Sequence, residues 1–119
     1  MQINFSIIIP VFNSAQFISE CIDSVIKQTY KNWEIIIIDN NSNDESVKII
    51  NSFKSEKIKI YKINNEGIIA KSRNLGIKKS EGNWIAFLDS DDSWEKNKLE
   101  ICLKYIKKND VDFIYHDLK

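Results

Sequence analysis

The fold of this chain is decided by residues 5–11, which read FSIIIPV. Continuous runs of β-branched residues are typical of strands that are buried on both faces, as in a parallel sheet. Residues 33–38 (WEIIII) repeat the pattern, so they predict a second buried strand. Residues 58–63 alternate more, which predicts a strand nearer the edge. Further strands are expected at residues 84–88 and 111–115.

Helical periodicity fills the intervals between these strands. Apolar residues recur at three- and four-residue spacing in residues 17–28, 47–53, 67–82 and 95–108. Asn13 or Ser14 is expected to cap the first of these helices. Alternating strands and helices predict an α/β fold with three layers, α/β/α, in which a mostly parallel sheet carries helices on both faces. Residues 1–119 should form a single domain.

Composition excludes several classes of function. The chain has 17 Lys+Arg and 17 Asp+Glu, so no global basic field favours nucleic acid or an anionic membrane. There is no secretory signal pattern, and no apolar stretch approaches the roughly 20 residues of a membrane span. Cys21 and Cys102 fall on apolar helix stripes, as reduced core residues do. We therefore expect a cytoplasmic protein without a transmembrane segment.

Polar side chains directly follow three of the predicted strands. Phe12 and Asn13 follow the first strand, Asp39 and Asn40 the second, and residues 89–92 (DSDD) the fourth. In parallel α/β sheets, ligands bind beyond the carboxyl ends of the strands. The three clusters should therefore meet in one crevice.

The acidic cluster after the fourth strand predicts a bound cation. Asp89, Asp91 and Asp92 repel one another at this spacing, whereas Mg²⁺ or Mn²⁺ would be held by their oxygens and would in turn neutralise phosphates. Asp91 is the candidate metal ligand, and Asp89 could bind a ribose or sugar hydroxyl. The alternative is a polar turn in which Asp92 caps the next helix.

The other two clusters could supply a nucleotide pocket. Pro10 has no N–H, which suits a strand end that turns over a ligand. Phe12 offers a flat face to a base, or packs under the first helix. Asp39 or Asn40 could accept a hydrogen bond from a ring N–H, or only form a turn. Asn13 lies in the same turn.

Three single residues have two interpretations each. Arg73 is the sole arginine, and its planar fork could hold a phosphate or carboxylate at two points, or form a surface salt bridge. Trp94 could wall the site or anchor the next helix in the core. His116, the only histidine, is an ordinary half-buried residue or a ligand.

Several known site patterns are missing from the sequence. It contains no Gly-X-Gly-X-X-Gly, no P-loop, no Gly-X-Ser-X-Gly elbow and no Cys-X-X-Cys pair. A phospho-acceptor receiver domain would need a carboxylate pair after the first strand, where this chain has Pro10-Val11-Phe12-Asn13.

Taken in order, five motifs resemble the N-terminal half of family 2 glycosyltransferases with the GT-A fold, which implies a Rossmann-like, nucleotide-binding architecture. They are residues 6–13 (SIIIPVFN), 28–35 (QTYKNWEI), 38–44 (IDNNSND), 72–76 (SRNLG) and 88–92 (LDSDD). The resemblance implies a nucleotide-diphosphate sugar donor, most often a UDP-sugar, with Mn²⁺ or Mg²⁺ held by Asp91 and Asp89. Phe12 and the Asp39–Asn40 pair would frame the base. The family more often has a tyrosine at Phe12 and a second aspartate at Asn40, so the amide would accept from a ring N–H more weakly than a carboxylate.

The resemblance also implies that this chain is shorter than a complete catalytic domain of the family. Catalytic domains of the family continue beyond the fifth strand, with the acceptor site and the catalytic base. None of Asp110, Asp112 and Asp117 stands in a motif that looks like that base. We therefore expect a truncated donor-binding half, inactive alone and prone to self-association through an uncovered side of the sheet. The alternative is a non-catalytic nucleotide-binding or assembly module.

Overall fold

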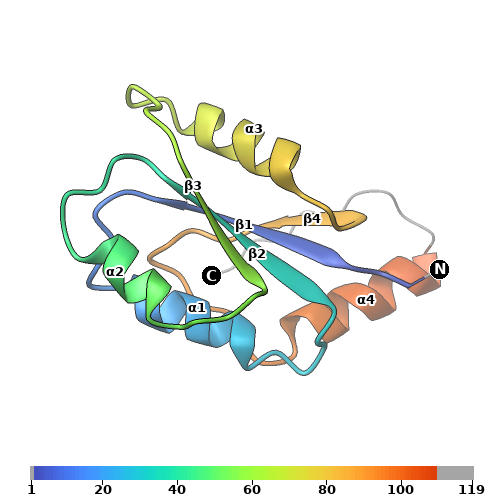
Figure 1. Ribbon diagram of the computed structural model, residues 1–119. Helices are drawn as coiled ribbons and strands as arrows, with labels where there is room; N and C mark the ends of the chain where they lie inside the picture. The colour runs from blue at the N-terminus through green and yellow to red at the C-terminus, as the bar shows by residue number, and fades with distance from the viewer. Residues whose placement is uncertain (1, 110–119) are drawn as a thin grey trace.

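A computed structural model describes residues 2–109 of the chain (Figure 1). Strands and helices alternate in the order β1 (Phe5–Val11), α1 (Ile18–Ile26), β2 (Trp33–Asp39), α2 (Ser46–Asn51), β3 (Ile58–Lys62), α3 (Ile69–Lys79), β4 (Trp84–Phe87) and α4 (Lys98–Asn109). This order matches the alternation expected from the sequence. The expected fifth strand at residues 111–115, together with His116, lies outside the described residues.

The four strands form one sheet in the order β3-β2-β1-β4, and every pairing is parallel. β1 pairs with β2 from Phe5 opposite Trp33 to Val11 opposite Asp39, so both strands end at the same level. β3 lies at one edge of the described sheet, as its alternating sequence predicts. The central strands are β1 and β2, the two continuous apolar runs.

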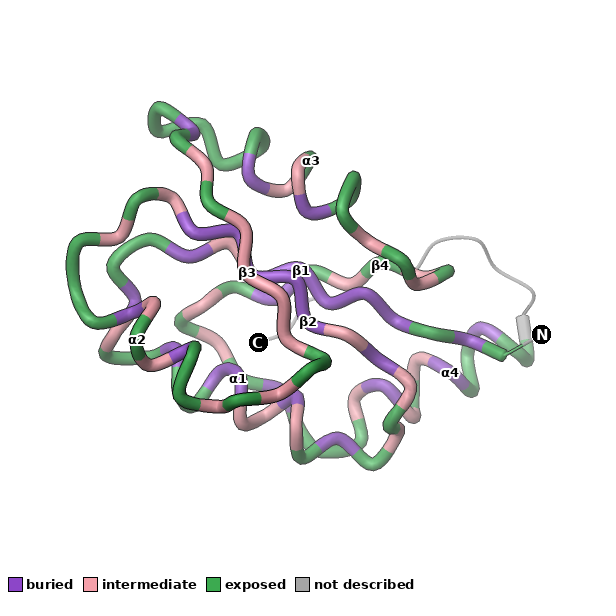
Figure 2. Tube along the Cα trace, in the orientation of Figure 1, coloured by how far each residue is buried: buried purple, intermediate pink, exposed green. Residues whose placement is uncertain are grey.

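Helices cover both faces of the sheet (Figure 1). α1, α2 and α4 lie on one face, where the larger core cluster joins Ile7 and Ile9 of β1 to Ile22 and Leu103. α3 lies on the other face, over a smaller cluster of Ile8, Ile36 and Ile38 in which Leu75 takes part. Figure 2 shows the buried residues concentrated along β1 and β2. The three-layer α/β/α prediction is confirmed.

The approach of α3 to the sheet depends on one glycine. A Cβ atom at Gly76 would overlap Cγ2 of Ile8 and lie 3.1 Å from its Cγ1. The Ile8 side chain is fully buried, so it has little room to move aside. Gly76 therefore sets how closely α3 packs on β1.

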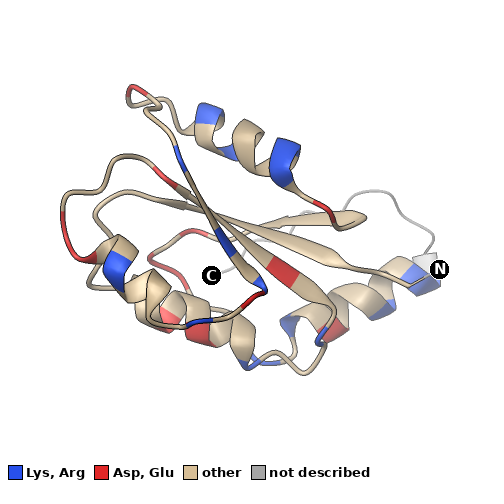
Figure 3. Ribbon diagram, in the orientation of Figure 1, with Lys and Arg blue, Asp and Glu red and all other residues tan. Residues whose placement is uncertain are grey.

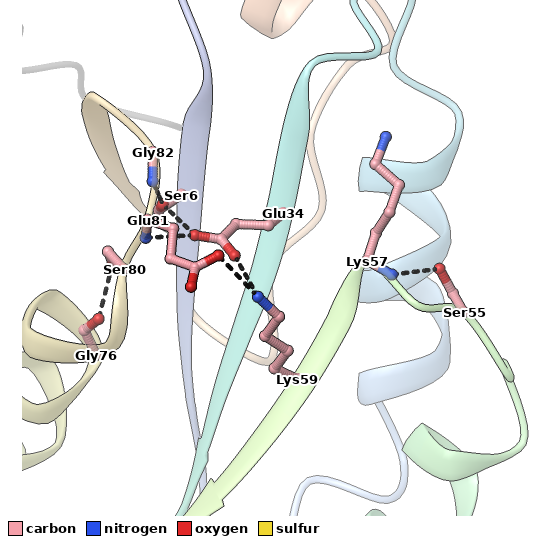
Figure 4. Close-up of polar contacts among 9 residues, drawn as sticks. All are labelled: Ser6, Glu34, Ser55, Lys57, Lys59, Gly76, Ser80, Glu81 and Gly82. Atoms are coloured by element: carbon pink, nitrogen blue, oxygen red, sulfur yellow. Dashed lines mark hydrogen bonds and ion pairs between the residues drawn. The ribbon is translucent and has the colours of Figure 1, made fainter.

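A polar brace holds the amino-terminal end of the sheet (Figure 4). The Glu34 carboxylate on β2 accepts hydrogen bonds from Ser6 Oγ at 2.6 Å and from the Glu81 N–H at 2.7 Å. Lys59 Nζ lies 3.2 Å from both Glu34 and Glu81. Burial alone would raise the pKa of Glu34, but these hydrogen bonds and the Lys59 charge together lower it. The brace ties β1, β2 and β3 to the segment between α3 and β4.

The helix caps differ from the sequence expectation. α1 begins without a side-chain cap, because the side chains of Asn13 and Ser14 bond to other loops. Asp92 lies before Lys98, the first residue of α4, and its own N–H bonds back to Asp89 O, so the proposed Asp92 cap is wrong. Instead Gln28, which is fully buried, accepts a hydrogen bond from the Leu99 N–H at 3.0 Å.

Candidate functional site

A cavity of about 460 Å³ opens at the carboxyl ends of the parallel strands. It is lined by residues that follow β1, β2 and β4 and by residues of α3 and the segment before it. Most of the residues predicted for the site line it, namely Pro10, Phe12, Asn13, Asn40, Arg73, Asp89 and Asp91. The structure therefore brings together segments that are far apart in the sequence, as the parallel topology requires.

Asn13 joins the loop after β1 to the loop after β2. Its backbone φ is 46°, a left-handed conformation that asparagine tolerates better than most residues. Its N–H donates to Ser42 Oγ at 2.9 Å, and its side-chain oxygen accepts from the Asn43 N–H at 2.9 Å. Ser14 adds a bond from its N–H to Ser46 Oγ at 2.7 Å. The two loops thus form one continuous wall.

Asp39 and Asn40 have different surroundings although they are neighbours in the sequence. Asp39 is 1% exposed, and its carboxylate accepts from both the N–H and the hydroxyl of Ser42, the latter at 2.6 Å. It forms the turn and is not among the residues that line the cavity. Asn40 lines the cavity, and its side-chain oxygen accepts from the Asn65 N–H at 2.9 Å.

Asn65 is a site residue that the sequence analysis missed. It is 6% exposed, and its amide donates to Ser72 Oγ at 2.9 Å and accepts from the Gly67 N–H at 2.9 Å. These bonds fix the segment between β3 and α3 against Asn40. The signal was present, because residues 64–67 (NNEG) are a polar turn at the carboxyl end of the third predicted strand.

Phe12 is exposed at the cavity. The side chain is 59% exposed and lines the cavity, so the alternative in which it packs under the first helix is wrong. An exposed aromatic ring beside polar groups is a common surface for stacking a flat ligand. Trp94, by contrast, is 8% exposed and belongs to the larger core cluster, which confirms its role as a core anchor.

The loop between β4 and α4 is acidic, as its red segments in Figure 3 show. Oxygen atoms of Asp89, Asp91 and Asp92 lie within 4.8 Å of one another, and the first two side chains are exposed. Two hydrogen bonds fix this loop to the segment that contains Ser14 and α1. Ser90 Oγ and Ser14 Oγ lie 2.7 Å apart, and the Cys21 thiol donates to Asp89 O at 3.5 Å. This holds the carboxylates at the edge of the cavity.

The donor set fits a hard divalent cation. Clustered carboxylate oxygens suit Mg²⁺ or Mn²⁺ and offer no soft ligand. The nearby Cys21 does not alter this, since burial first, and then the charges of Asp92, Asp89 and Asp91, raise the pKa of its thiol to about 12. Cys21 and Cys102 are free thiols, as expected, and Cys21 is a buried residue of α1.

Arg73 contacts the acidic loop from α3. Its Nη2 lies 3.6 Å from Asp89 Oδ1, and its guanidinium carbon lies 5.7 Å from the centre of the Phe87 ring. The side chains of Arg73 and Asp89 are 40% and 55% exposed, so this ion pair contributes only about 0–1 kcal/mol. Arg73 therefore forms a salt bridge, as one interpretation held, but a weak one.

No helix within residues 2–109 is both long enough and apolar enough to cross a membrane.

The sequence of this chain is similar to those of known proteins. The model of Glycosyl transferase family 2 matches residues 6–118. UDP-Glc:alpha-D-GlcNAc-diphosphoundecaprenol beta-1,3-glucosyltransferase WfgD from Escherichia coli is 41% identical over 92% of this chain and 44% of its own length. An uncharacterized glycosyltransferase from Rickettsia felis is 47% identical over 91% of this chain and 18% of its own length.

Solved structures agree with the sequence matches. The crystal structure of Staphylococcus aureus TarS 1-349 in complex with UDP has a TM-score of 0.85 and 30% identity over 90% of this chain. The match covers 33% of that structure, so this chain spans a minor part of the proteins it resembles. The parallel sheet and flanking helices are those of the GT-A fold. The chain belongs to Glycosyl transferase family 2.

Proposed function

We propose that this chain binds a nucleotide-diphosphate sugar, with a UDP-sugar as the first candidate, in the cavity at the carboxyl ends of the strands. The supporting observation is that one cavity presents an aromatic ring, an amide, a guanidinium and a carboxylate pair, from Phe12, Asn40, Arg73, Asp89 and Asp91. TarS, which has been crystallised with UDP, has the same fold at 30% identity.

Each side chain has a role that its position supports. Phe12 would stack on the base, and Asn40 beside it would contact the edge of the base. Asp89 would bind a ribose or sugar hydroxyl, and Arg73 the diphosphate. Pro10 and Asn13 would shape the wall.

Asp39 would support the pocket indirectly. Its carboxylate holds Ser42, and Ser42 Oγ in turn accepts from the N–H of Asn13, a residue of the cavity wall.

Asp91 and Asp89 would hold Mn²⁺ or Mg²⁺, and the exposed position of both carboxylates is suited to that task. When bound, the ion supplies positive charge that stabilises a departing diphosphate. Asp92 is half-buried and adds to the negative potential of the loop.

The reaction we propose for the whole protein is transfer of the sugar to an acceptor in polysaccharide or glycoconjugate synthesis. WfgD, at 41% identity, is named as a glucosyltransferase that acts on a diphosphoundecaprenol acceptor. Because the chain corresponds to 44% of WfgD, we propose donor binding without transfer as the property of residues 1–119 alone.

Isothermal calorimetry with UDP, with and without Mn²⁺, tests the proposed function. We expect UDP to bind in the presence of Mn²⁺ and to bind much more weakly after chelation of the metal. Absence of heat under both conditions would favour the alternative, a non-catalytic assembly module with the same fold.

Replacing Arg73 with alanine should weaken UDP binding by roughly tenfold to 100-fold, because charge-assisted hydrogen bonds to a phosphate contribute about 1.5–3 kcal/mol. Lys71→Ala on the same helix is the matched control, since Lys71 pairs with Glu66 and does not line the cavity. Equal affinities for the two variants would contradict the role of Arg73.

We also propose self-association through the face of the sheet beside α3. The β4 residues Ile85 and Phe87 lie opposite Ser6 and Ile8 of β1, so they share the face that α3 covers. They are nevertheless 37% and 40% exposed, because α3 packs over β1 and β2. Light scattering should show a molar mass that rises with concentration and falls in the variant Ile85→Lys. A constant monomer mass across concentration would contradict this proposal.

A further inference from the structure

We propose that Asn40 contacts the nucleobase as a hydrogen-bond donor, and that the site therefore accepts cytosine about as well as uracil. This inference rests on the proposed function, since it assumes that a nucleotide occupies the cavity. It reverses the polarity expected from the sequence, in which the amide oxygen would accept from a ring N–H.

The orientation of the Asn40 amide follows from its partner. A backbone N–H can only donate, so the Asn40 atom 2.9 Å from the Asn65 nitrogen must be the side-chain oxygen. The amide NH₂ is then the remaining polar group of the side chain. Among residues 2–109, that NH₂ group makes no hydrogen bond. Because Asn40 lines the cavity, the NH₂ group is available to a ligand.

This orientation is held in place by its surroundings. Asn65 is buried, with its own side chain bonded to Ser72 on α3 and to the Gly67 N–H. Rotating the Asn40 amide by half a turn would set its NH₂ against the Asn65 N–H, losing the bond and leaving a buried donor unpaired. One lone pair of the oxygen is therefore used by the Asn65 N–H, whereas both hydrogens of the NH₂ group are available to a base.

The position of Asn40 places it at the edge of a stacked base. The register of β1 and β2 pairs Val11 with Asp39, so Phe12 and Asn40 are the next residues along the two chains. The Asn40 N–H donates to Val11 O at 2.8 Å, which keeps the two chains together past the end of the strands. A ring stacked on Phe12 would thus have its polar edge near the Asn40 side chain.

Pyrimidine edges respond differently to a donor and to an acceptor. Uracil presents N3–H between two carbonyl oxygens, and cytosine presents an N3 lone pair between its carbonyl oxygen and its N4 amino group. An NH₂ group finds an acceptor on either base. A carboxylate would accept from N3–H at the centre of the uracil edge, whereas on cytosine it would face the N3 lone pair there and could accept only from the N4 amino group at one end of the edge. Asn40 should therefore leave the two bases nearly equal, and an aspartate at this position should separate them.

The test is a comparison of UDP and CDP affinities with Mn²⁺ by calorimetry. For the unchanged chain we expect the two dissociation constants to agree within about threefold. For Asn40→Asp we expect UDP to be preferred by about tenfold or more, as a base-edge hydrogen bond can discriminate. One carboxylate oxygen can still accept from the Asn65 N–H, so the variant should keep its fold, which circular dichroism can verify.

The control is Asn43→Asp, which adds the same charge to the same loop at an exposed residue outside the cavity lining. It should leave the ratio of UDP to CDP affinity unchanged. Binding of both nucleotides with a tenfold preference of the unchanged chain for UDP would overturn this inference alone. Binding of neither nucleotide would overturn the proposed function, and this inference with it.

Discussion

The Asp91→Ala variant should bind UDP in the presence of Mn²⁺ about 100-fold more weakly than the unchanged chain, or not measurably. The variant lacks one of the carboxylate oxygens proposed to hold the ion, and a loss of about 2.7 kcal/mol of binding free energy corresponds to about 100-fold. Asp91 is exposed at the cavity and lies in the carboxylate cluster, so its loss removes a proposed metal ligand without opening the core. Calorimetry measures the affinity, and thermal unfolding should show an unchanged midpoint.

The matched control for this variant is Glu56→Ala. Glu56 is also an exposed carboxylate, but it precedes β3, at the end of the sheet opposite the cavity. Its removal changes the net charge by the same amount and should leave UDP affinity as it was. Unchanged affinity in Asp91→Ala, with the control also unchanged, would remove Asp91 from the metal site.

The Gly76→Ala variant should be destabilised by about 1–3 kcal/mol, the usual cost of inserting a methyl group into a packed core. Helix propensity alone predicts the opposite, a gain of about 1 kcal/mol. Contact decides the sign here, because the new Cβ would overlap the fully buried Ile8 side chain. The free energy of unfolding in urea measures the effect.

Two further variants distinguish the effect of the contact between residue 76 and Ile8 from the effect of helix propensity. Lys78→Ala changes an exposed position of α3 and should alter the free energy of unfolding by less than about 0.5 kcal/mol. Combining Gly76→Ala with Ile8→Ala should cost less than the sum of the single changes, because the smaller residue makes room for the new methyl group. A stabilised Gly76→Ala variant would show that α3 is not held this closely to β1.

The central strands were predictable from the sequence because a continuous apolar run indicates a strand that is buried on both faces. The runs at residues 5–11 and 33–38 are apolar on both faces, and the structure buries both faces. The polar residues after these strands could be assigned to one crevice, because parallel strands bring their carboxyl ends to one edge. That part of the site follows from topology and needs no knowledge of side-chain contacts.

The contacts within the site were not predictable in the same way. Asp39 and Asn40 are adjacent polar residues, and only the Ser42 turn shows that one is buried while the other lines the cavity. The prediction that Ser14 could cap the first helix was wrong for a similar reason. Ser14 bonds instead to Ser46 and Ser90, which are distant in the sequence. Asn65 was missed because its role depends on Asn40 in another loop and on Ser72 of α3.

The central claim is that a divalent cation and a nucleotide diphosphate meet beside Asp91, at the carboxyl ends of the strands. The most direct measurement is anomalous scattering from manganese in a crystal grown with UDP and Mn²⁺. The account predicts an anomalous peak within coordination distance of Asp91, adjacent to the density of the diphosphate. A peak elsewhere, or a nucleotide bound away from the acidic loop, would contradict it.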